Sequence, residues 1–485
     1  MAKFNNKQDN EKLVENEEGV YAYKKEEREH LVTMVLTSFY NEEKFYGDNS
    51  KLLVETCKKV IKYDAKFVAN LAIYARKEMN LRSISHVITC LLANIEEGKK
   101  YVKQVCENAV LRADDILEIL AFYVNTYGKP IPNSLKKGLA ASMEKFDEYQ
   151  FAKYTKKGSA FNFRDVLRLT HAKAKTEERN ILYKKIIADE LATSYTWETE
   201  LSAKGNNAEV WEELIESGKV GYLAMLRNLN NILKVNPSNL DKALEFIANE
   251  QNVLNSRVLP FRYYSAYKTL KSNPNFTSKV VNALESAMEI SLKNVDRIPG
   301  KTLIAVDVSG SMGCRISRKS DVACSDIAAV LGSMANSICE DSIVVTFDDT
   351  LKVVHLSNKS GILTNVKSIK FNGGSTYCNL PIEYLNKNKI VVDRIIMLSD
   401  NMCNYDFFSE HETNAQKALN TYRKKINSDV IMHAVDLMGY STKIFKNEKT
   451  NNYIAGWSEK LLEYIMLYEK GITSLEKDIA EYVIK

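Results

Sequence analysis

Lys301-Thr-Leu-Ile-Ala-Val-Asp307-Val-Ser309-Gly-Ser311-Met312 is the stretch of this sequence that decides the fold. Its apolar run is typical of a buried strand in a parallel sheet. The turn that follows carries an aspartate, a glycine and two serines. Ligands of open parallel sheets bind beyond the carboxyl ends of the strands, where small oxygen donors suit a hard cation such as Mg²⁺. Asp307 and the serines could instead simply cap the next helix, because these residues are favoured at helix starts.

Two later segments favour a site over independent caps. Phe371–Thr376 is a loop that contains two glycines and ends in a hydroxyl group. Ile395–Asp400 is a second buried-looking strand, and it stops on a carboxylate. All three positions offer oxygen ligands and no soft ligand.

The order Asp-x-Ser-x-Ser, then Thr, then Asp resembles the metal-ion-dependent adhesion site of von Willebrand factor A domains. The resemblance runs from about Lys301 to the C-terminus and implies a doubly wound α/β fold with a divalent metal, expected to be Mg²⁺. Thr376 is preferred to Ser375 because its four-residue step to Leu380 resembles the spacing of the family. The serines and the threonine would coordinate directly, and the aspartates directly or through water. The implied metal ligands are Asp307, Ser309, Ser311, Thr376 and Asp400.

Composition and length bound the class of protein. With 485 residues and 55.1 kDa, the chain is too long for one ordinary core. Met1–Glu18 is polar and lacks the apolar core of a signal peptide, and no run approaches the ~18 apolar residues of a membrane span. The 8 cysteines form no Cys-x-x-Cys pair and lie in apolar or helical patterns, so we expect reduced, mostly buried thiols. A cytoplasmic location follows from these features.

The part of the chain before the A domain has the pattern of a helical repeat protein. From Glu26 to Asn294, apolar residues recur at helical spacing in more than a dozen segments, among them Lys51–Tyr63 and Ala65–Met79. Short breaks with proline and small polar residues separate these segments, and strand signals are nearly absent. Many short amphipathic helices predict an α-solenoid, whose extended surface usually binds macromolecules.

Strand and helix signals alternate in the A domain. We expect a helix at Asp321–Cys339, strands at Ser342–Phe347 and Leu351–His355, and a helical tail from Ser458. The remaining expected elements are a helix at Leu380–Asn388, a strand at Ile390–Leu398, a helix at Glu412–Lys425 and a strand at Asp429–Leu437.

The positive charge is concentrated in one segment. The net charge of the whole chain is +5, whereas Lys153–Lys185 alone contains ten basic residues against three acidic ones. Such a cluster is a reasonable binding surface for a polyanion. It could equally be the solvated face of a helix.

Three segments in the helical part carry a second resemblance. Phe163–Lys173, Leu223–Leu229 and Leu259–Arg262 with the following Ala266–Thr269 occur in this order before the A domain. Together they resemble the TROVE module of the Ro ribonucleoprotein autoantigen family, from about residue 20 onward. The resemblance divides the chain into a polar leader (1–20), a TROVE module of HEAT-like helical repeats (21–296) and a von Willebrand factor A domain (297–485).

That resemblance implies a function in RNA metabolism. Proteins of the family close their HEAT-like repeats into a ring with the A domain. They bind small structured Y RNAs on the outer surface and single-stranded 3′ ends of misfolded RNAs in the central hole. In bacterial relatives, the Y RNA can tether the ring to the exonuclease polynucleotide phosphorylase. We therefore expect an RNA-binding adaptor in noncoding RNA quality control, with neither a DNA partner nor a membrane partner.

The resemblance also nominates contact residues. His171 falls on a histidine that contacts Y RNA, Lys153 matches a contacting lysine, and Lys157 matches a contacting arginine by type only. A lone histidine after an apolar run could instead be a core or capping group, and Arg168 could pair with Asp165. Arg227 and Arg262 could line the hole or pair with carboxylates between helices. The residues predicted to bind RNA are Lys153, Lys156, Lys157, Arg164, Arg168, His171 and Lys173.

Two other function classes are weaker. A metal-dependent hydrolase would use Asp307 and Asp400, but the sequence offers no second-metal cluster and no phosphate-cradling loop. A metal-dependent protein-binding scaffold would use the A domain alone. We therefore expect no enzymatic activity. A surface of Lys and Arg should recognise the shape and phosphates of RNA, so binding should weaken steeply with salt.

Overall fold

The computed structural model describes residues 13–15, 21–24, 27–37, 48–155, 160–192, 195–315, 322–357, 360–403, 412–438, 442–446, 448, 450–456, 460–470 and 477–482. The chain divides into two compact units. The A-domain unit comprises residues 1–39 and 244–472, and the helical unit comprises residues 40–243 and 473–485. None of the described helices has the length and apolar character needed to cross a membrane.

A six-stranded sheet forms the centre of the A-domain unit. Its strand order is β5-β4-β3-β6-β7-β9, with all neighbours parallel except the antiparallel pair β4 and β5. This is the doubly wound sheet that the alternation of strand and helix signals predicts. The strands are β3 (Ile298–Asp307), β4 (Cys339–Phe347), β5 (Leu351–Val354), β6 (Arg394–Ser399), β7 (Ile431–Asp436) and β9 (Asn451–Ala455).

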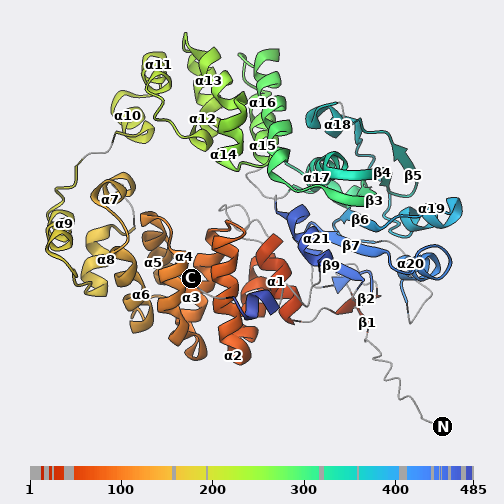
Figure 1. Cartoon of the computed structure of the whole chain (residues 1–485), viewed down its shortest axis with the longest axis horizontal. Helices are drawn as coiled ribbons and strands as arrows, with labels where there is room; N and C mark the ends of the chain where they lie inside the picture. Colours follow the sequence, from red (N-terminus) through yellow and green to blue (C-terminus); the bar gives the residue numbers. More distant parts are fainter. Residues whose placement is uncertain are drawn as a thin grey trace. The chain divides into compact units, whose positions relative to one another are not determined.

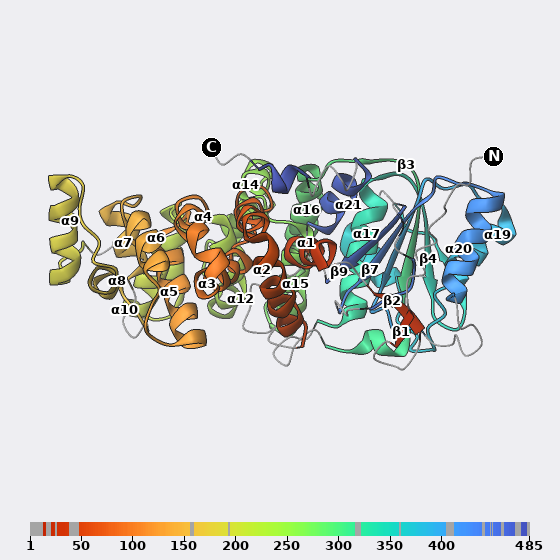
Figure 2. The ribbon, with the colours of Figure 1, turned by 90° about the horizontal axis from the view of Figure 1, so that it is seen from below.

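Helices cover both faces of this sheet. Leu303 and Ala305 of β3 point into a core shared with α19 (Leu380–Asn388) and α20 (Asn414–Lys425). The alternate residues Ile304 and Val306 lie against α17 (Cys324–Ile338). Figure 2 shows α17 on the opposite side of the sheet from α19 and α20. A Cβ atom at Gly332 of α17 would lie 2.9 Å from Val306 Cγ2, so the absence of a side chain lets this helix approach the sheet.

The A-domain unit also contains helices from outside the A-domain sequence. Helix α15 (Pro260–Leu270) is anchored to α17, because Tyr264 Oη and Lys268 Nζ donate to the Asp326 carboxylate at 2.7 and 2.6 Å. Glu285 accepts a 3.0 Å hydrogen bond from the backbone N–H of Leu363. These contacts tie α15 to α17 and the Glu285 helix to the segment that begins at Ile362. The other helices are α14 (Glu250–Ser256), α16 (Ser278–Ser291), α18 (Ile362–Ser368) and α21 (Leu461–Glu469), with short 3₁₀ segments η2 (Leu292–Asn294) and η3 (Gly310–Gly313).

The N-terminal helix belongs to the A-domain unit as well. Helix α1 (Glu27–Thr37) packs on β9 and α21, and its residues Leu31, Val35 and Leu36 are fully buried. Strands β1 (Leu13–Glu15) and β2 (Tyr21–Lys24) pair with β8 (Thr442–Lys443) in a small antiparallel sheet. Strand β1 lies within residues 1–20, which the sequence predicts to be a polar leader.

The helical unit has the packing of a solenoid. Its helices pack mainly on helices close by in sequence: α2 on α3, α4 on α6, α6 on α8 and α8 on α9 (Figure 1). The helices are α2 (Asp48–Lys77), α3 (Ser83–Asn94), α4 (Val102–Ala109), α5 (Ala113–Tyr127), α6 (Asn133–Met143), α7 (Glu148–Tyr154), α8 (Phe163–Thr170), α9 (Glu177–Ala188), α10 (Trp197–Lys204), α11 (Ala208–Glu216) and α12 (Tyr222–Val235), with a 3₁₀ segment η1 (Glu96–Tyr101). Helix α13 (Leu240–Ala248) spans the division between the units.

Helix starts in this unit follow from capping chemistry. Helices α7 and α8 begin with capping boxes, Asp147 with Gln150 and Asn162 with Asp165. α2 runs through both predicted helices, but Asp64 has a non-helical backbone, and its Oδ1 accepts from the N–H of Phe67 at 3.1 Å. Asp64 therefore caps the second half of α2, so the predicted break between Tyr63 and Ala65 is present as a kink.

The structure corrects the expectation that all cysteines are reduced. Cys378 and Cys403 form a disulfide with a Cα–Cα distance of 6.0 Å. The two residues lie 25 positions apart, a spacing that matches no motif, and only the fold brings their loops together. The other six cysteines are free thiols, and five of them are buried. The inference of a cytoplasmic location loses part of its support.

Candidate functional site

The predicted metal ligands converge at one edge of the sheet. Strands β3 and β6 are parallel neighbours in register from Thr302 with Arg394 to Val306 with Leu398. Asp307 and Asp400 therefore leave the carboxyl ends of adjacent strands. From β3 the chain crosses to β4 on one side, and from β6 it crosses to β7 on the other. This point is where ligands of doubly wound sheets bind.

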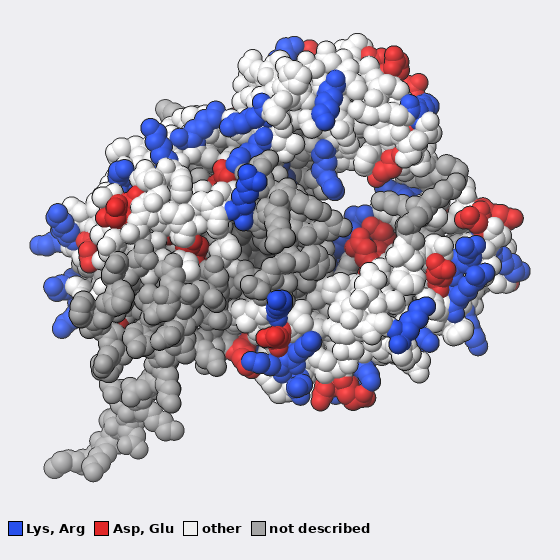
Figure 3. Space-filling model, turned by 180° about the vertical axis from the view of Figure 1, so that it is seen from behind, with Lys and Arg blue, Asp and Glu red and all other residues white. Residues whose placement is uncertain are grey.

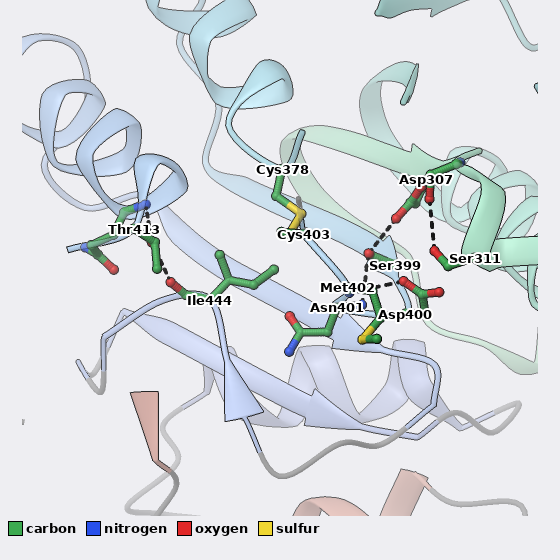
Figure 4. Close-up of a disulfide and its surroundings, with 12 residues drawn as sticks. Asp307, Ser311, Cys378, Ser399, Asp400, Asn401, Met402, Cys403, Thr413 and Ile444 are labelled. Atoms are coloured by element: carbon green, nitrogen blue, oxygen red, sulfur yellow. Dashed lines mark hydrogen bonds between the residues drawn. A yellow bond between two sulfur atoms is a disulfide. The ribbon is translucent and has the colours of Figure 1, made fainter. Parts of the chain in front are cut away.

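Hydrogen bonds fix both carboxylates (Figure 4). Ser399 Oγ donates to Asp307 Oδ2 at 2.6 Å, and the backbone N–H of Ser309 donates to Asp307 Oδ1 at 2.9 Å. The N–H of Met402 donates to Asp400 Oδ1 at 3.1 Å. Ser309 Oγ and Ser311 Oγ lie 3.3 Å apart in the turn after β3. The sequence nominated these aspartates and serines as metal ligands but did not nominate Ser399, which donates to Asp307.

A close backbone contact joins the first loop of the site to the glycine loop. The N–H of Gly310 donates to the carbonyl oxygen of Gly374 at 2.8 Å. A Cβ atom at Gly310 would lie 3.2 Å from the carbonyl oxygen of Gly373, so this position needs a small residue. The following Thr376 is buried, whereas Ser375 is half-buried. Burial at the junction of the loops supports the choice of Thr376.

The disulfide links two loops of the same site. Cys378 follows Thr376 by two residues, and Cys403 follows Asp400 by three. Figure 4 shows the disulfide close to Ser399 and Asp400. It therefore restrains the loops that carry Thr376 and Asp400.

Electrostatics indicates what the oxygen cluster can hold. Burial, together with the charge of Asp400, raises the pKa of Asp307 to about 7. Burial also raises the pKa of Asp400, and the Ser311 hydroxyl partly offsets the effect. Two carboxylates that share a buried site repel each other, and a divalent cation would relieve this repulsion. The donor set of carboxylate and hydroxyl oxygens fits a hard cation such as Mg²⁺.

A second polar cluster in the helical unit is less suited to a metal. His86 of α3 lies 3.2 Å from Asp115 and 3.3 Å from Glu118, both on α5. Arg82 contacts both carboxylates, and Arg76 lies 3.5 Å from Asp115. Because two guanidinium groups already neutralise these acids, we interpret the cluster as an ion-pair network that joins α3 to α5.

The predicted RNA-binding residues lie on α7, α8 and the segment after α8. Lys153, Arg168, His171 and Lys173 are exposed, and Arg164 is half-buried with its Nε atom inaccessible to solvent. Phe151 of α7 packs edge-on against Phe163 of α8 at 4.8 Å between ring centroids, which holds the two helices together. Lys156 and Lys157 lie outside the described residues.

The structure bears on the alternatives for His171 and Arg168, because it shows His171 outside the core and Asp165 engaged in a capping box. His171 ends α8 in the left-handed conformation with φ 53°, and its side chain is exposed. The backbone of His171 forms the C-cap of α8, and its imidazole is exposed to solvent. Asp165 is used by the capping box, where it accepts from the N–H of Asn162 at 2.9 Å. No ion pair of Arg168 is found in the part of the chain that the structure describes.

Arg112 is a basic neighbour that the sequence did not nominate. Its guanidinium lies 5.0 Å from the ring centroid of Tyr154, and Lys153 Nζ lies 5.6 Å from the same centroid. Arg112 precedes α5 and is far from α7 in sequence, so no local pattern predicts this group. Arg112 also pairs with Asp114, with 2.9 Å between Nη2 and Oδ2. A tyrosine ring with cations beside it is suited to stacking and phosphate contacts.

Comparison with protein families decides the identity of the chain. The TROVE domain model matches residues 22–195 and 187–274, and the Ro60 vWA domain model matches residues 301–466. The chain belongs to the TROVE family. This TROVE protein carries both modules that the sequence resemblance implied.

Similar proteins include telomerase components and Ro proteins. Telomerase protein component 1 of Rattus norvegicus is 24% identical over 44% of this chain and 11% of its own length. The RNA-binding protein RO60 is 27% identical in Caenorhabditis elegans and 23% identical in Deinococcus radiodurans, each over 40% of this chain. These matches cover 32% and 39% of the two RO60 proteins, so this TROVE protein matches well under two thirds of each relative.

A solved structure shows the same fold over almost the whole chain. This TROVE protein superposes on the crystal structure of the Ro (RSR) protein of Deinococcus radiodurans with a TM-score of 0.67 and 17% sequence identity. The matched region covers 92% of this chain and 100% of the solved chain. The predicted fold class, helical repeats with a von Willebrand factor A domain, is confirmed.

Proposed function

We propose that this TROVE protein binds structured RNA through the surface of α7, α8 and the segment after α8. The observation that carries the proposal is a set of exposed cations without counterions. Among the described residues, no ion pair of Lys153, Arg168 or Lys173 is found, whereas Lys185 on α9 pairs with Glu148. Cations that no carboxylate neutralises are available to phosphates. The relatives named RNA-binding protein RO60 support the same class of ligand.

The finer proposal concerns the kind of RNA. We infer that the ligand is a small structured Y RNA, with single-stranded 3′ ends of misfolded RNA as a second ligand. The protein would act in the cytoplasm as a non-enzymatic adaptor in RNA quality control, with an exonuclease such as polynucleotide phosphorylase as partner. Lysine and arginine on helices read duplex shape rather than base sequence.

A triple variant tests the surface. Lys153→Ala, Arg168→Ala and Lys173→Ala together should weaken binding of an RNA hairpin with a single-stranded 3′ end, measured by fluorescence anisotropy at several salt concentrations. The salt slope of the binding constant should fall by roughly one for each phosphate that the variant no longer binds. The matched control removes three lysines elsewhere in the helical unit, Lys137→Ala, Lys234→Ala and Lys242→Ala. If both variants lost the same affinity, the loss would come from the lower net charge rather than from this surface, and the proposal would be overturned.

The A domain supports a second candidate function, in which a bound Mg²⁺ presents a free coordination position to a carboxylate of a protein partner. The buried oxygen cluster at the sheet edge favours this candidate. The same oxygen cluster is where a hydrolase would act. Single-stranded RNA incubated with the protein and Mg²⁺ should stay intact, and cleavage that disappears in Asp307→Ala would establish an enzyme instead.

A further inference from the structure

Three sulfur atoms from separate segments meet at the edge of the sheet that carries the oxygen cluster, where β3 and β7 end. Cys314 follows the turn after β3, Cys324 begins α17, and Met438 follows β7. The two Sγ atoms lie 3.2 Å apart and are not bonded. Met438 Sδ lies 3.4 Å from Cys324 Sγ and 4.0 Å from Cys314 Sγ. All three residues belong to the A-domain unit.

Backbone contacts hold these sulfur atoms in place. Arg315 and Ala323 form an antiparallel bridge, and the N–H of Cys324 donates to the carbonyl oxygen of Cys314 at 3.0 Å. The N–H of Met438 donates to Asp436 Oδ1 at 3.0 Å, which fixes the chain after β7. Cys314 is exposed, Met438 is half-buried and Cys324 is buried, so the cluster is open to solvent on the side of Cys314.

The separations suit one shared ion. A metal–thiolate bond is about 2.3 Å long, so sulfur atoms around one ion lie roughly 3.5–4 Å apart. Of the three observed distances, 4.0 Å lies at the upper end of this range, and 3.2 and 3.4 Å are slightly shorter, so a small outward shift of Cys324 Sγ would admit the ion. A disulfide between Cys314 and Cys324 would use two of the sulfur atoms and would leave the position of Met438 without a role.

We propose that Cys314, Cys324 and Met438 form a binding site for a soft monovalent metal ion, Cu(I). Thiolate and thioether sulfur select Cu(I), whereas Mg²⁺ and Ca²⁺ prefer oxygen. Zn²⁺ in structural sites takes four Cys, His or carboxylate ligands and is not matched by two cysteines and a methionine. Each thiol loses its proton to solvent as its sulfur binds the metal. The A domain thus presents a soft site next to a hard one.

Competition with a chromogenic Cu(I) chelator tests the proposal on the full chain. Without oxygen and with ascorbate as reductant, the parent protein should withdraw one Cu(I) from bicinchoninate. Cys314→Ser with Cys324→Ser should withdraw none. Met438→Leu conserves side-chain volume but removes the thioether sulfur. Loss of a group that merely supports a metal ligand lowers metal affinity roughly 10- to 100-fold, so loss of a ligand itself should lower the Cu(I) affinity by at least as much. X-ray absorption of the copper-loaded parent should show sulfur neighbours alone.

The controls separate the site from general thiol binding and from misfolding. Met466→Leu changes a half-buried methionine of α21 outside the cluster and should bind copper like the parent. Far-UV circular dichroism and thermal unfolding should match the parent for each variant. Copper uptake that survives the double cysteine substitution, or nitrogen and oxygen neighbours in the absorption spectrum, would overturn the proposal. Two further results would overturn it. One is peptide mapping that finds a disulfide between Cys314 and Cys324, together with no copper uptake after that disulfide is reduced. The other is binding of Zn²⁺ as tight as the binding of Cu(I).

Discussion

Asp307 is a buried carboxyl group with two defined hydrogen-bond donors and a second carboxylate nearby. Ser399 Oγ and the N–H of Ser309 occupy one oxygen each, and the charge of Asp400 adds to the effect of burial on its pKa. A carboxylate in this position destabilises the fold unless a cation neutralises it. The residue therefore gives a direct way to test whether the A domain binds a metal.

Asp307→Asn should remove the stabilisation of the A domain by Mg²⁺. For the parent, thermal unfolding in MgCl₂ rather than EDTA should show a higher Tm, because a ligand at about 100 times its Kd adds about 2.7 kcal/mol. In EDTA, the variant should unfold at no lower temperature than the parent, because it lacks the buried charge. Asp349→Asn, a substitution of an exposed carboxylate outside the ligand set, should keep the full Mg²⁺ effect. A Mg²⁺-dependent Tm shift in Asp307→Asn would contradict the assigned ligands.

Single residues differ in how far the sequence predicts them. The residues proposed as metal ligands could be nominated because each follows an apolar strand or a glycine loop, where a short pattern marks the chemistry, and their binding of a metal stays a prediction. Ser399, Arg112 and the Cys378–Cys403 disulfide were not, because their roles depend on partners far away in sequence. The positions of Lys156 and Lys157 stay a prediction.

At the scale of helices, the ion-pair network joins α3 to α5. Burial by itself lowers the pKa of His86, but contacts with Asp115 and Glu118 outweigh it, so the pKa is raised above its ordinary 6.5. A histidine whose pKa is higher in the folded state contributes stability that is fully present below the pKa of the unfolded chain. That stability is lost as the pH rises through the raised value.

His86→Asn should therefore destabilise the α3–α5 pair at pH 6 and have less effect at pH 9. We expect a loss of about 2 kcal/mol at pH 6, the size of a hydrogen bond to a charged group. Hydrogen exchange of peptides that cover α3 and α5 measures this local stability at both pH values, corrected for intrinsic exchange. His355→Asn, at an exposed histidine, is the control and should show no such dependence. A deficit that is equal at both pH values would exclude titration of His86 as the cause.

Elements with long apolar periodicity were predicted best. Helix α17 and strands β3, β4 and β6 were predicted because buried runs of apolar residues mark them. Their starts were less certain: β4 begins before the predicted Ser342, and β6 begins after the predicted Ile390. Helices α7, α10, α14 and α18 were missed. Helices α7, α14 and α18 have seven residues each, too few for a clear period, and α10, with eight residues, has no buried residue. Strand β9 was missed because its polar Asn451 and Asn452 interrupt the apolar pattern.

At the scale of the whole molecule, the charge is mixed and the units differ from the sequence domains. Figure 3 shows both basic and acidic side chains across one face of the molecule. RNA binding should therefore depend on local surfaces rather than on the net charge of +5. Helices α14 to α16 precede the predicted A-domain boundary at residue 297, yet they belong to the unit of the sheet. Closure of the helices into a ring stays a prediction.

Removal of helices α14 to α16 should make the A domain less soluble. A fragment of residues 297–472 lacks Tyr264 and Lys268, the partners of Asp326, and lacks Glu285, the partner of α18. A fragment of residues 244–472 keeps all three. We expect the longer fragment to be the more soluble and to show the stronger near-UV circular dichroism, because it covers the apolar face of α17. Since both fragments lack α1, equal behaviour would show that α14 to α16 contribute nothing.

The position of α1 also has a consequence for synthesis on the ribosome. Its apolar residues Leu31, Val35 and Leu36 are covered by β9 and α21, which are translated near the other end of the chain. At roughly 5–20 residues per second, the helix waits on the order of 20 to 80 seconds for these partners. A nascent chain with this exposed stripe is a natural client for ribosome-associated chaperones.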